Sequence, residues 1–411
     1  MKELFEKARA TSYKLMNLNT KVKNEALAAI ARKLDEHREL IKTENAKDLK
    51  AGVEAGLSSS LMDRLKLDDK AINSMIKAVN EIKEQTDPVG SVVDGYKRPN
   101  GLYITKIRVP LGVVGIIYES RPNVTIDAAA LCLKSGNVSI LRGGKEAIHS
   151  NACLGKIMEE AIAEAGLPEG VVNIVPDTDR FRVTEMLQAK GYIDIIIPRG
   201  GAGLIKFCDE NTCIPLVKHD NGICHVYVDK DADIEKALKI ARNAKVQRPG
   251  VCNAAETLLV HEDVAGAFLP SFVECTSKDG LEIRGCERTL SFVDVKPATE
   301  EDWRTEYLDL IISIKVVSSM EEALVHINRY GSGHSEAIIT ENYTSARYFM
   351  DRADASAVFV NASTRFNDGG EFGLGAEIGI STQKLHCRGP MGAFDLTTTK
   401  YQVYGDGHIR E

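Results

Sequence analysis

Val113-Val-Gly-Ile-Ile-Tyr118 is a continuous apolar and largely β-branched run, the pattern of a strand that is buried on both faces. After it we expect a helix from Thr125 to Lys134, ended by Gly136, and then a second buried strand at Val138-Ser-Ile-Leu141. The same alternation continues to a strand at Tyr192-Ile-Asp-Ile-Ile-Ile197. Strands of this kind separated by helices predict a parallel sheet with helices on both faces.

The rest of the chain adds a second α/β series and a helical N-terminal part. Residues 1 to about 85 carry apolar residues three and four apart, the spacing of amphipathic helices. A second series of strands and helices runs from about 226 to 385. At 411 residues the chain is too long for one ordinary hydrophobic core, so we expect two or three domains.

Two β-rich stretches stand apart from these series. One is Leu102-Tyr-Ile-Thr-Lys-Ile-Arg-Val109, and the other is Leu396-Thr-Thr-Thr-Lys-Tyr-Gln-Val-Tyr404 in the tail. Lone ribbons expose unpaired strand edges, which invite a further strand. We therefore expect a second subunit to cover these edges and the protein to be a homo-oligomer.

The composition is that of a soluble globular protein. Hydrophobic residues make up 44% and charged residues 27% of the sequence, and the formal net charge of −7 argues against a nucleic-acid binder. No apolar run reaches the roughly 18–20 residues of a membrane span, and Met1–Lys7 lacks the apolar core of a signal peptide. The nine cysteines form no C-x-x-C pair, so we expect a cytoplasmic protein with reduced thiols and no metal site.

One cysteine has a setting that suits a nucleophile, in Val246-Gln-Arg-Pro-Gly-Val-Cys-Asn-Ala-Ala-Glu256. A helix expected over 234–244 must end before the Pro-Gly pair, because proline cannot continue a helix and glycine permits a sharp turn. Cys252 therefore follows a rigid turn and precedes a strand expected at 257–260. A small buried thiol is the alternative, since cysteine is often buried, but the polar neighbours favour a reactive residue.

A glycine-rich turn follows Ile197 and opens a helix, in Pro198-Arg-Gly-Gly-Ala-Gly-Leu-Ile205. Gly200, Gly201 and Gly203 let backbone N–H groups approach a ligand, and a helix N-terminus attracts phosphate. These glycines are therefore candidate cofactor-binding residues. The turn lacks the G-x-G-x-x-G spacing of the standard dinucleotide motif, and tight packing alone explains many such turns.

A second turn, Leu141-Arg-Gly-Gly-Lys145, has the same place after a strand. Folds that choose NADP put a cation near the ribose 2′-phosphate, whereas folds that choose NAD put a carboxylate near the 2′-hydroxyl. Arg142 and Lys145 supply such cations and predict NADP(H) as the cofactor. A solvated basic turn explains these charges equally well, but two such turns on one sheet favour a nucleotide site.

Eight motifs in one order make the sequence resemble a known family. They are Tyr118-Glu-Ser-Arg-Pro-Asn-Val-Thr125, Ile140-Leu-Arg-Gly-Gly144, Ile197-Pro-Arg-Gly-Gly201, Arg248-Pro-Gly-Val-Cys-Asn253, Tyr330-Gly-Ser-Gly-His-Ser-Glu336, Val360-Asn-Ala-Ser-Thr-Arg365, Gly375-Ala-Glu-Ile-Gly379 and Arg388-Gly-Pro-Met-Gly392. Together they are similar to the γ-glutamyl phosphate reductase (glutamate-5-semialdehyde dehydrogenase) family of the aldehyde dehydrogenase superfamily. The resemblance extends from about residue 5 to the C-terminus.

The resemblance implies an α/β fold with two Rossmann-like domains and a small β oligomerisation element. We expect a cofactor-binding domain over 1–222, interrupted by a β ribbon at about 98–111, a catalytic thiol domain over 223–392, and an oligomerisation tail over 393–411 that pairs with the ribbon. It also implies NADPH-dependent reduction of L-glutamyl 5-phosphate to L-glutamate 5-semialdehyde and phosphate, the second step of proline biosynthesis. Glutamate 5-kinase is then an expected functional partner.

The same resemblance assigns roles to individual residues. Cys252 is expected to form a thioester, Asn123 to donate to its oxyanion, and Glu306 to bind the nicotinamide ribose. Hydrolytic aldehyde dehydrogenases carry a glutamate that activates water, and His219 stands in its place here. The loss of this base suits a reductase, because a hydrolytic base would waste the thioester as free glutamate. A purely structural role for His219 is the alternative. Without that base, and with Glu256 expected to point away from Cys252, the thioester should react with phosphate rather than water.

The α-amino and α-carboxylate groups of such a substrate need partners. Arg121 and Arg365 are candidates for a bidentate carboxylate clamp and Glu377 for the ammonium group, although structural ion pairs explain each equally well. Two other functions stay open: an aldehyde dehydrogenase with a different or CoA-linked substrate, and a thiol hydrolase that pairs Cys252 with His219. Dependence on NADP(H) and on phosphate would separate them.

Overall fold

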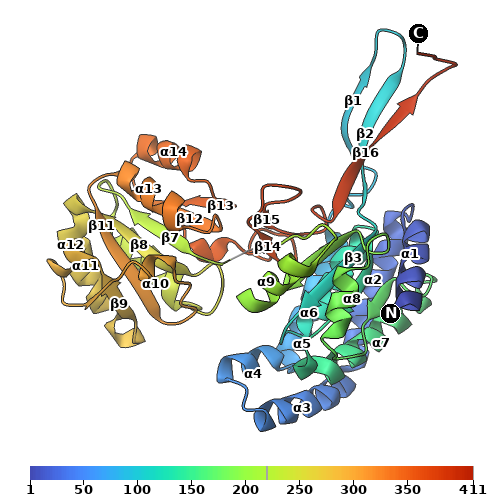
Figure 1. Cartoon of the computed structure of the whole chain (residues 1–411), viewed down its shortest axis with the longest axis horizontal. Helices are drawn as coiled ribbons and strands as arrows, with labels where there is room; N and C mark the ends of the chain where they lie inside the picture. The colour runs from blue at the N-terminus through green and yellow to red at the C-terminus, as the bar shows by residue number, and fades with distance from the viewer. Residues whose placement is uncertain (219–220, 411) are drawn as a thin grey trace. The chain divides into compact units, whose positions relative to one another are not determined.

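The computed structural model describes residues 1–218 and 221–410, which form two compact units (Figure 1). Unit 1 comprises Met1–Lys218, Gly373–Gly379 and Met391–Glu411, and unit 2 comprises His219–Phe372 and Ile380–Pro390. The sequence predicted one continuous second domain over 223–392, whereas the chain returns to unit 1 twice within this range. The two returning segments bond to each other, because Ile378 N–H donates to the Met391 carbonyl at 3.1 Å.

The N-terminal part of unit 1 consists of helices. They are α1 (Lys2–Leu15), α2 (Thr20–Glu36), α3 (Arg38–Glu54), α4 (Ser59–Leu65) and α5 (Asp69–Glu84). Of these, α2, α4 and α5 have side-chain caps. The Asn19 side chain accepts the N–H of Val22, and the Asp68 side chain accepts that of Ala71, which satisfies amide groups that a first helical turn leaves unpaired. The expected helical region over residues 1–85 is confirmed.

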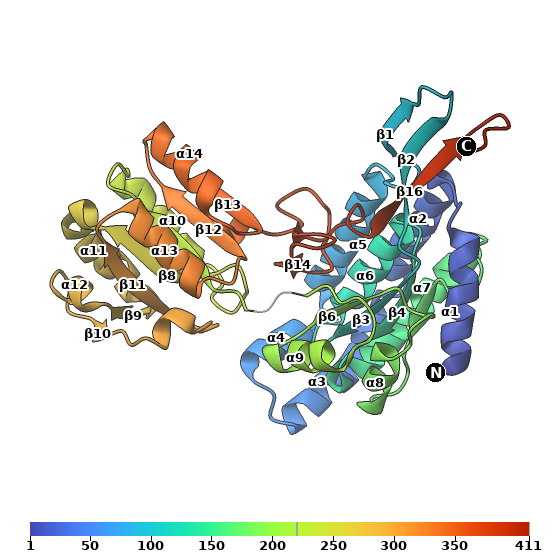
Figure 2. The ribbon, with the colours of Figure 1, turned by 45° about the horizontal axis from the view of Figure 1, so that its top comes forward.

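The parallel sheet predicted around Val113–Tyr118 is present in unit 1. Its strands are β3 (Val113–Tyr118), β4 (Val138–Arg142), β5 (Val172–Ile174) and β6 (Ile195–Arg199), in the order β5-β4-β3-β6. The helices of this part are α6 (Asn123–Lys134), α7 (Ile148–Glu164), α8 (Phe181–Leu187) and α9 (Ala202–Asn211), with a 3₁₀ turn at Lys145–Ala147. In Figure 2, α8 and α9 lie together on one face of the sheet, and α6 and α7 lie together on the other.

The strand order determines where this sheet can bind a ligand. Every residue of β3 and β4 is buried, as strands covered on both faces require. The chain adds β4 and β5 on one side of β3 and then places β6 on its other side, so the strand order reverses between β3 and β6. The turns at the carboxyl ends of these two strands therefore flank the crevice in which parallel α/β sheets bind nucleotides.

The two β-rich stretches form an antiparallel arm in unit 1. Its strands are β1 (Val92–Lys97), β2 (Tyr103–Pro110) and β16 (Thr397–Tyr404), in the order β1-β2-β16. The tail strand pairs with β2 along its whole length, from Thr397 opposite Pro110 to Tyr404 opposite Tyr103. Figure 1 shows the arm extending away from the helices of unit 1. Among the described residues, the outer edges of β1 and β16 have no neighbouring strand.

Unit 2 is built on a second parallel sheet, with strands in the order β10-β9-β11-β8-β7-β12-β13. The strands are β7 (Cys224–Val228), β8 (Ala255–His261), β9 (Glu282–Gly285), β10 (Lys296–Pro297), β11 (Ile311–Val317), β12 (Ser335–Ile339) and β13 (Ala357–Val360). The helices are α10 (Ile234–Val246), α11 (Glu262–Thr276), α12 (Glu287–Leu290), α13 (Met320–Tyr330) and α14 (Tyr343–Arg352). Two short strands, β14 (Ile380–Ser381) and β15 (Gly389–Pro390), pair with each other.

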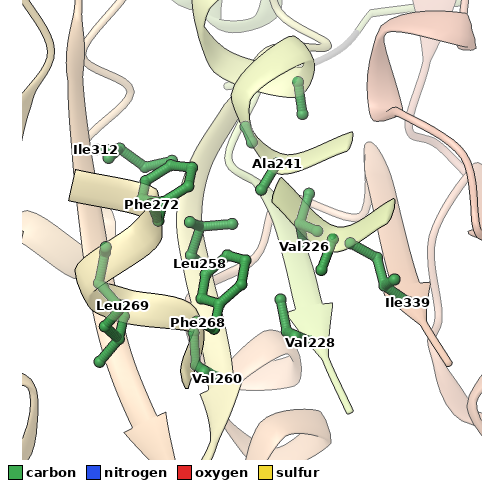
Figure 3. Close-up of a cluster of buried hydrophobic side chains, with 14 of the residues drawn as sticks. Val226, Val228, Ala241, Leu258, Val260, Phe268, Leu269, Phe272, Ile312 and Ile339 are labelled. Atoms are coloured by element: carbon green, nitrogen blue, oxygen red, sulfur yellow. The ribbon is translucent and has the colours of Figure 1, made fainter. Parts of the chain in front are cut away.

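Apolar cores cover both faces of the unit 2 sheet. Phe268 and Phe272 of α11 stack with ring centroids 5.4 Å apart beside Leu258 of β8 (Figure 3). Both rings are fully buried, and burying such a side chain contributes about 1.5–3 kcal/mol. On the other face, Tyr227 and Phe349 stack at 6.2 Å. The second α/β series expected from the sequence is confirmed.

Within the two ranges that the structure describes, no helix combines the length and the apolar character needed to cross a membrane. The same ranges contain no group of three or more side chains arranged to hold a metal ion.

Candidate active site

Cys252 lies in unit 2, on the loop between α10 and β8. The helix ends at Val246 and the strand begins at Ala255, which confirms the helix, turn and strand predicted around this residue. Cys252 is half-buried, whereas every residue of β8 is buried. The thiol therefore stands next to a rigid strand without being enclosed in the core.

The main chain of Cys252 rests against Gly222 and Cys224. A side-chain carbon on Gly222 would collide with the Cys252 carbonyl oxygen and would lie 2.5 Å from its Cα, so only glycine fits there. The Cys224 thiol, at the start of β7, donates to the same carbonyl at 3.1 Å. Together these contacts fix the position of the Cys252 loop.

Arg365, one of the expected substrate clamps, is bonded to this loop. Its Nη1 donates to Oδ1 of Asn253, and its Nε donates to the side chain of Gln247 at 2.9 Å. Burial lowers the pKa of Arg365, and the negative charges of Asp368 and of an ionised Cys252 act to raise it. The guanidinium therefore lies within electrostatic range of the thiol and holds the loop on both sides of it.

Glu256, four residues after the thiol, forms a buried ion pair. Its Oε2 lies 2.5 Å from Nζ of Lys245, and at most 1% of either side chain is exposed. Burial raises the pKa of Glu256 to about 8, although the charge of Lys245 opposes this rise. The carboxyl group is thus held by Lys245 of α10, and its orientation away from Cys252 stays a prediction.

Glu306, on the loop before β11, reaches the glycine that supports Cys252. Burial raises the pKa of its carboxyl group, while a hydrogen bond from the Gly222 backbone and the charge of His334 lower it. The residue that the resemblance places on the cofactor ribose therefore contacts the Cys252 surroundings in unit 2. His219, predicted at the position of a hydrolytic base, lies outside the described residues.

The turn after β6 presents backbone N–H groups at the carboxyl end of the unit 1 sheet. In the described ranges, nothing within 4 Å would meet a side chain at Gly201 or Gly203, whereas one at Gly200 would collide with the Glu119 carboxylate. The Gly201 N–H donates to Oε2 of Glu119 at 3.0 Å. The turn already holds a carboxylate and has open space, so it fits a negatively charged group such as a cofactor phosphate.

Arg142 and Lys145 lie at the end of the neighbouring strand β4. Arg142 is 8% exposed, and its Nη2 donates to the Thr178 carbonyl at 2.9 Å. Its buried Nε has no hydrogen-bond partner among the described residues. Lys145 is exposed at the start of the 3₁₀ turn. Both cations therefore lie at the end of the sheet that carries the glycine turn, although Arg142 also holds the loop after β5.

Asn123 is the first residue of α6. Its Nδ2 donates to Oδ2 of Asp127 at 3.0 Å, one helical turn further on. Burial raises the pKa of Asp127 to about 6, while the Asn123 bond and the charge of Arg199 lower it. A side-chain amide has two N–H donors, and this bond uses one of them to set the orientation of the amide.

The three expected substrate ligands are divided between the units. Glu377 of unit 1 is paired with Arg199 at 3.3 Å, and both side chains are largely buried. Arg121, also of unit 1, is half-buried in the loop after β3. Arg365 belongs to unit 2. No single unit therefore brings the three residues together.

Sequence reasoning missed four side chains that shape these regions: Glu119, Asp127, Lys245 and Cys224. Glu119 had a visible signal, because a polar residue directly after a buried parallel strand faces the ligand crevice. Asp127 had another, because it stands four residues after Asn123, the spacing of neighbours on a helix. Lys245 and Cys224 had none, since their partners Glu256 and Cys252 belong to other elements.

Comparisons with known proteins show which family this chain resembles. The family model "Aldehyde dehydrogenase family" matches residues 1–281. The γ-glutamyl phosphate reductase of Nautilia profundicola is 54% identical and covers 100% of both chains, and that of Moorella thermoacetica is 56% identical and covers 99% of this chain and 97% of its own. The crystal structure of γ-glutamyl phosphate reductase from Thermotoga maritima matches with a TM-score of 0.96 and 52% identity, covering 100% of this chain and 99% of that one.

The chain therefore belongs to the aldehyde dehydrogenase family, a class of oxidoreductases that act on aldehydes with a nicotinamide cofactor. Within this class it is a member of the γ-glutamyl phosphate reductase family, which confirms the resemblance found in the eight motifs.

Proposed function

We propose that this chain reduces L-glutamyl 5-phosphate to L-glutamate 5-semialdehyde and phosphate with NADPH, through a thioester on Cys252. This is the second step of proline biosynthesis. The observation that carries the proposal is an identity of 54–56%, along almost the whole chain, with proteins named γ-glutamyl phosphate reductase. The fixed loop around Cys252 supports the covalent step.

In the first step Cys252 acts as a thiolate, because the thiolate rather than the thiol is the nucleophile. The positive charge of Arg365, which is bonded to the neighbouring Asn253, favours the ionised sulfur. The sulfur attacks the acyl carbon, a carbon–sulfur bond forms, and the bond from that carbon to the phosphate oxygen breaks. Phosphate leaves as an anion and needs little help from an acid.

Negative charge develops on the carbonyl oxygen during this attack. We assign its stabilisation to the side-chain amide of Asn123 and the backbone N–H of Cys252; one such donor contributes about 3–4 kcal/mol. Asp127 holds the amide of Asn123 in one orientation. Gly222 and Cys224 support the main chain that bears the Cys252 N–H.

NADPH, when bound, supplies the hydride that reduces the thioester. The glycine turn at 200–203 would hold a phosphate of the cofactor through backbone N–H groups, Arg142 and Lys145 would hold its 2′-phosphate, and Glu306 its ribose. The carbon–sulfur bond of the resulting thiohemiacetal anion then breaks, which frees the aldehyde and restores the Cys252 thiolate.

The amino-acid end of the substrate requires a cation and an anion. We propose Arg121 for the carboxylate and Glu377 for the ammonium group. Glu377 would then bind both the ammonium group and Arg199. Arg365 is less suited to the clamp than the sequence indicated, because its Nε and Nη1 are bonded to the Cys252 loop.

The reverse reaction tests the proposal. Purified enzyme, NADP and glutamate semialdehyde should form NADPH with inorganic phosphate as the acceptor, and should not do so with coenzyme A in its place. Turnover that requires coenzyme A would identify a CoA-linked aldehyde dehydrogenase. Hydrolysis of thioesters without any nucleotide would identify a thiol hydrolase. In the forward direction, kcat/KM should be higher with NADPH than with NADH.

The cellular setting is part of the same proposal. We propose a cytoplasmic homo-oligomer that is joined through the arm, with glutamate 5-kinase as the source of its substrate. Exposed apolar side chains on β1 and β16, among them Val92, Val93, Tyr401 and Val403, support contact with a second copy. The net charge of −7 supports the absence of a nucleic-acid partner.

A further inference from the structure

Glu119 spans the crevice at which the strand order of unit 1 reverses. It follows β3, and its Oε2 accepts the N–H of Gly201, which follows β6, at 3.0 Å. A side-chain carbon on Gly200 would collide with the same carboxylate. Doubly wound sheets bind dinucleotides between these two turns. Glu119 therefore already occupies the Gly201 N–H, one of the donors that a cofactor phosphate would use.

The Glu119 carboxylate and a phosphate would compete for the same donors. Helix N-termini bind anions through backbone N–H groups and the positive end of the helix dipole. Two anions at one N-terminus repel each other. Glu119 is exposed, while its backbone N–H donates to the Arg199 carbonyl at 3.1 Å. The side chain can therefore rotate away while the main chain of the turn stays in place.

A buried cation at the same end of the sheet points to an anionic ligand. Arg142 is 8% exposed, and its Nε has no hydrogen-bond partner among the described residues. Burial lowers the pKa of Arg142, while the charges of Glu146, Glu119 and Asp177 raise it. Glu119 is thus within electrostatic range of Arg142 and offsets part of its positive charge.

We infer that Glu119 is an internal anion that must leave the N-terminus of α9 before a dinucleotide phosphate binds, and that it thereby lowers the affinity for the cofactor. The inference rests on the proposed function and adds to it a residue that limits binding without taking part in the chemistry. An apparent dissociation constant equals the intrinsic one divided by the fraction of molecules that can bind. A turn closed in about 90% of molecules would therefore weaken binding about tenfold.

The test is direct binding of NADPH to the full chain, measured by the fluorescence of the reduced nicotinamide. Glu119→Gln keeps the size of the side chain but removes its charge, so the dissociation constant should fall about three- to tenfold. Adenosine diphosphate, measured by calorimetry, should show the same gain, and adenosine should show none. Glu119→Ala should behave like Glu119→Gln.

The matched control is Glu210→Gln, which removes the same charge near the other end of α9, from an exposed carboxylate paired with Lys206. Its dissociation constants should equal those of the wild type. Thermal unfolding of each variant would show that the fold is kept.

The outcomes separate this inference from the proposed function. Unchanged or weaker NADPH binding in Glu119→Gln, with normal binding by the wild type, would overturn the role of Glu119 and leave the proposed function standing. Wild-type protein that binds no NADPH would refute the proposed function. In that case the role of Glu119 is tested by adenosine diphosphate alone. An unchanged dissociation constant for adenosine diphosphate in Glu119→Gln would overturn this role.

Discussion

Among single residues, two cysteines of unit 2 differ in their surroundings. Cys252 is half-buried on its loop, whereas Cys387 is buried. Cys252→Ala should abolish the proposed reductase activity with little change in the melting temperature, because this thiol is the proposed nucleophile and contributes little to the core. Cys387→Ala should keep nearly all of the activity. Steady-state turnover near the wild-type value in Cys252→Ala would rule out Cys252 as the nucleophile.

The charge of Arg365 is expected to keep Cys252 reactive at neutral pH. In Arg365→Gln, alkylation of Cys252 by iodoacetamide at pH 7 should slow several-fold, because less of the sulfur is ionised. The midpoint of the rate against pH should move to higher pH. Arg352→Gln on α14, where the guanidinium covers the ring of Tyr348, is the control. An unchanged midpoint in Arg365→Gln would show that other groups ionise the thiol.

The contrast between Cys252 and Arg365 shows which site residues a sequence can reveal. The turn before Cys252 is visible because proline and glycine determine the local backbone. Arg365 looked available for a substrate because its partners are distant in the chain: Asn253 is 112 residues away and Gln247 is 118. Only the fold brings these amides to the guanidinium.

Between elements, the contact of Gly222 with Cys252 joins the segment before β7 to the loop before β8. Gly222→Ala would place a carbon 2.5 Å from the Cys252 Cα, and backbone atoms cannot give way as a flexible side chain can. We expect a loss of about 1–3 kcal/mol in the free energy of unfolding and a large loss of kcat. Denaturant titration and steady-state kinetics measure both.

Gly266→Ala in α11 is the matched control for this substitution. The nearest atoms, in the ring of Phe292, would be 3.7 Å from the added carbon, so the variant should gain up to about 1 kcal/mol of stability from its helix propensity. Wild-type stability and activity in Gly222→Ala would mean that the Cys252 loop is not held through this contact.

The elements themselves were largely predictable, because apolar β-branched runs and helical spacing are local patterns. The strand expected at 192–197 is an instructive exception, since the observed strand begins at Ile195. Its pairing with β3 begins there, opposite Val114, and no local pattern encodes that register. The return of 373–379 to unit 1 was equally invisible, because its contacts, such as the backbone bond between Ile378 and Met391 and the ion pair between Glu377 and Arg199, join separate parts of the chain.

For the whole molecule, the arm is the expected site of self-association. Tyr401 and Val403 of β16 are 61% and 56% exposed, two residues apart on one side of the strand. Replacing both by aspartate should lower the mass in sedimentation equilibrium while the circular dichroism spectrum stays unchanged, because two charges would be placed in an apolar contact. The same replacement of Val325 and Tyr343, exposed on the helices of unit 2, should leave the mass unaltered. A monomeric wild type would contradict this role of the arm.

We propose that a thioester on Cys252 persists until phosphate arrives, because the site does not activate water. Water is present at about 55 M, so phosphate can be the acceptor only if the barrier for attack by water stays high. Glu256, the carboxyl group nearest in sequence, is held in a buried ion pair by Lys245, and we expect it not to act as the base. The most direct measurement mixes enzyme, NADP and glutamate semialdehyde without phosphate and follows NADPH with time. We expect one burst no larger than the enzyme concentration, absent in Cys252→Ala, and steady turnover once phosphate is added. Sustained formation of free glutamate without phosphate would contradict this mechanism.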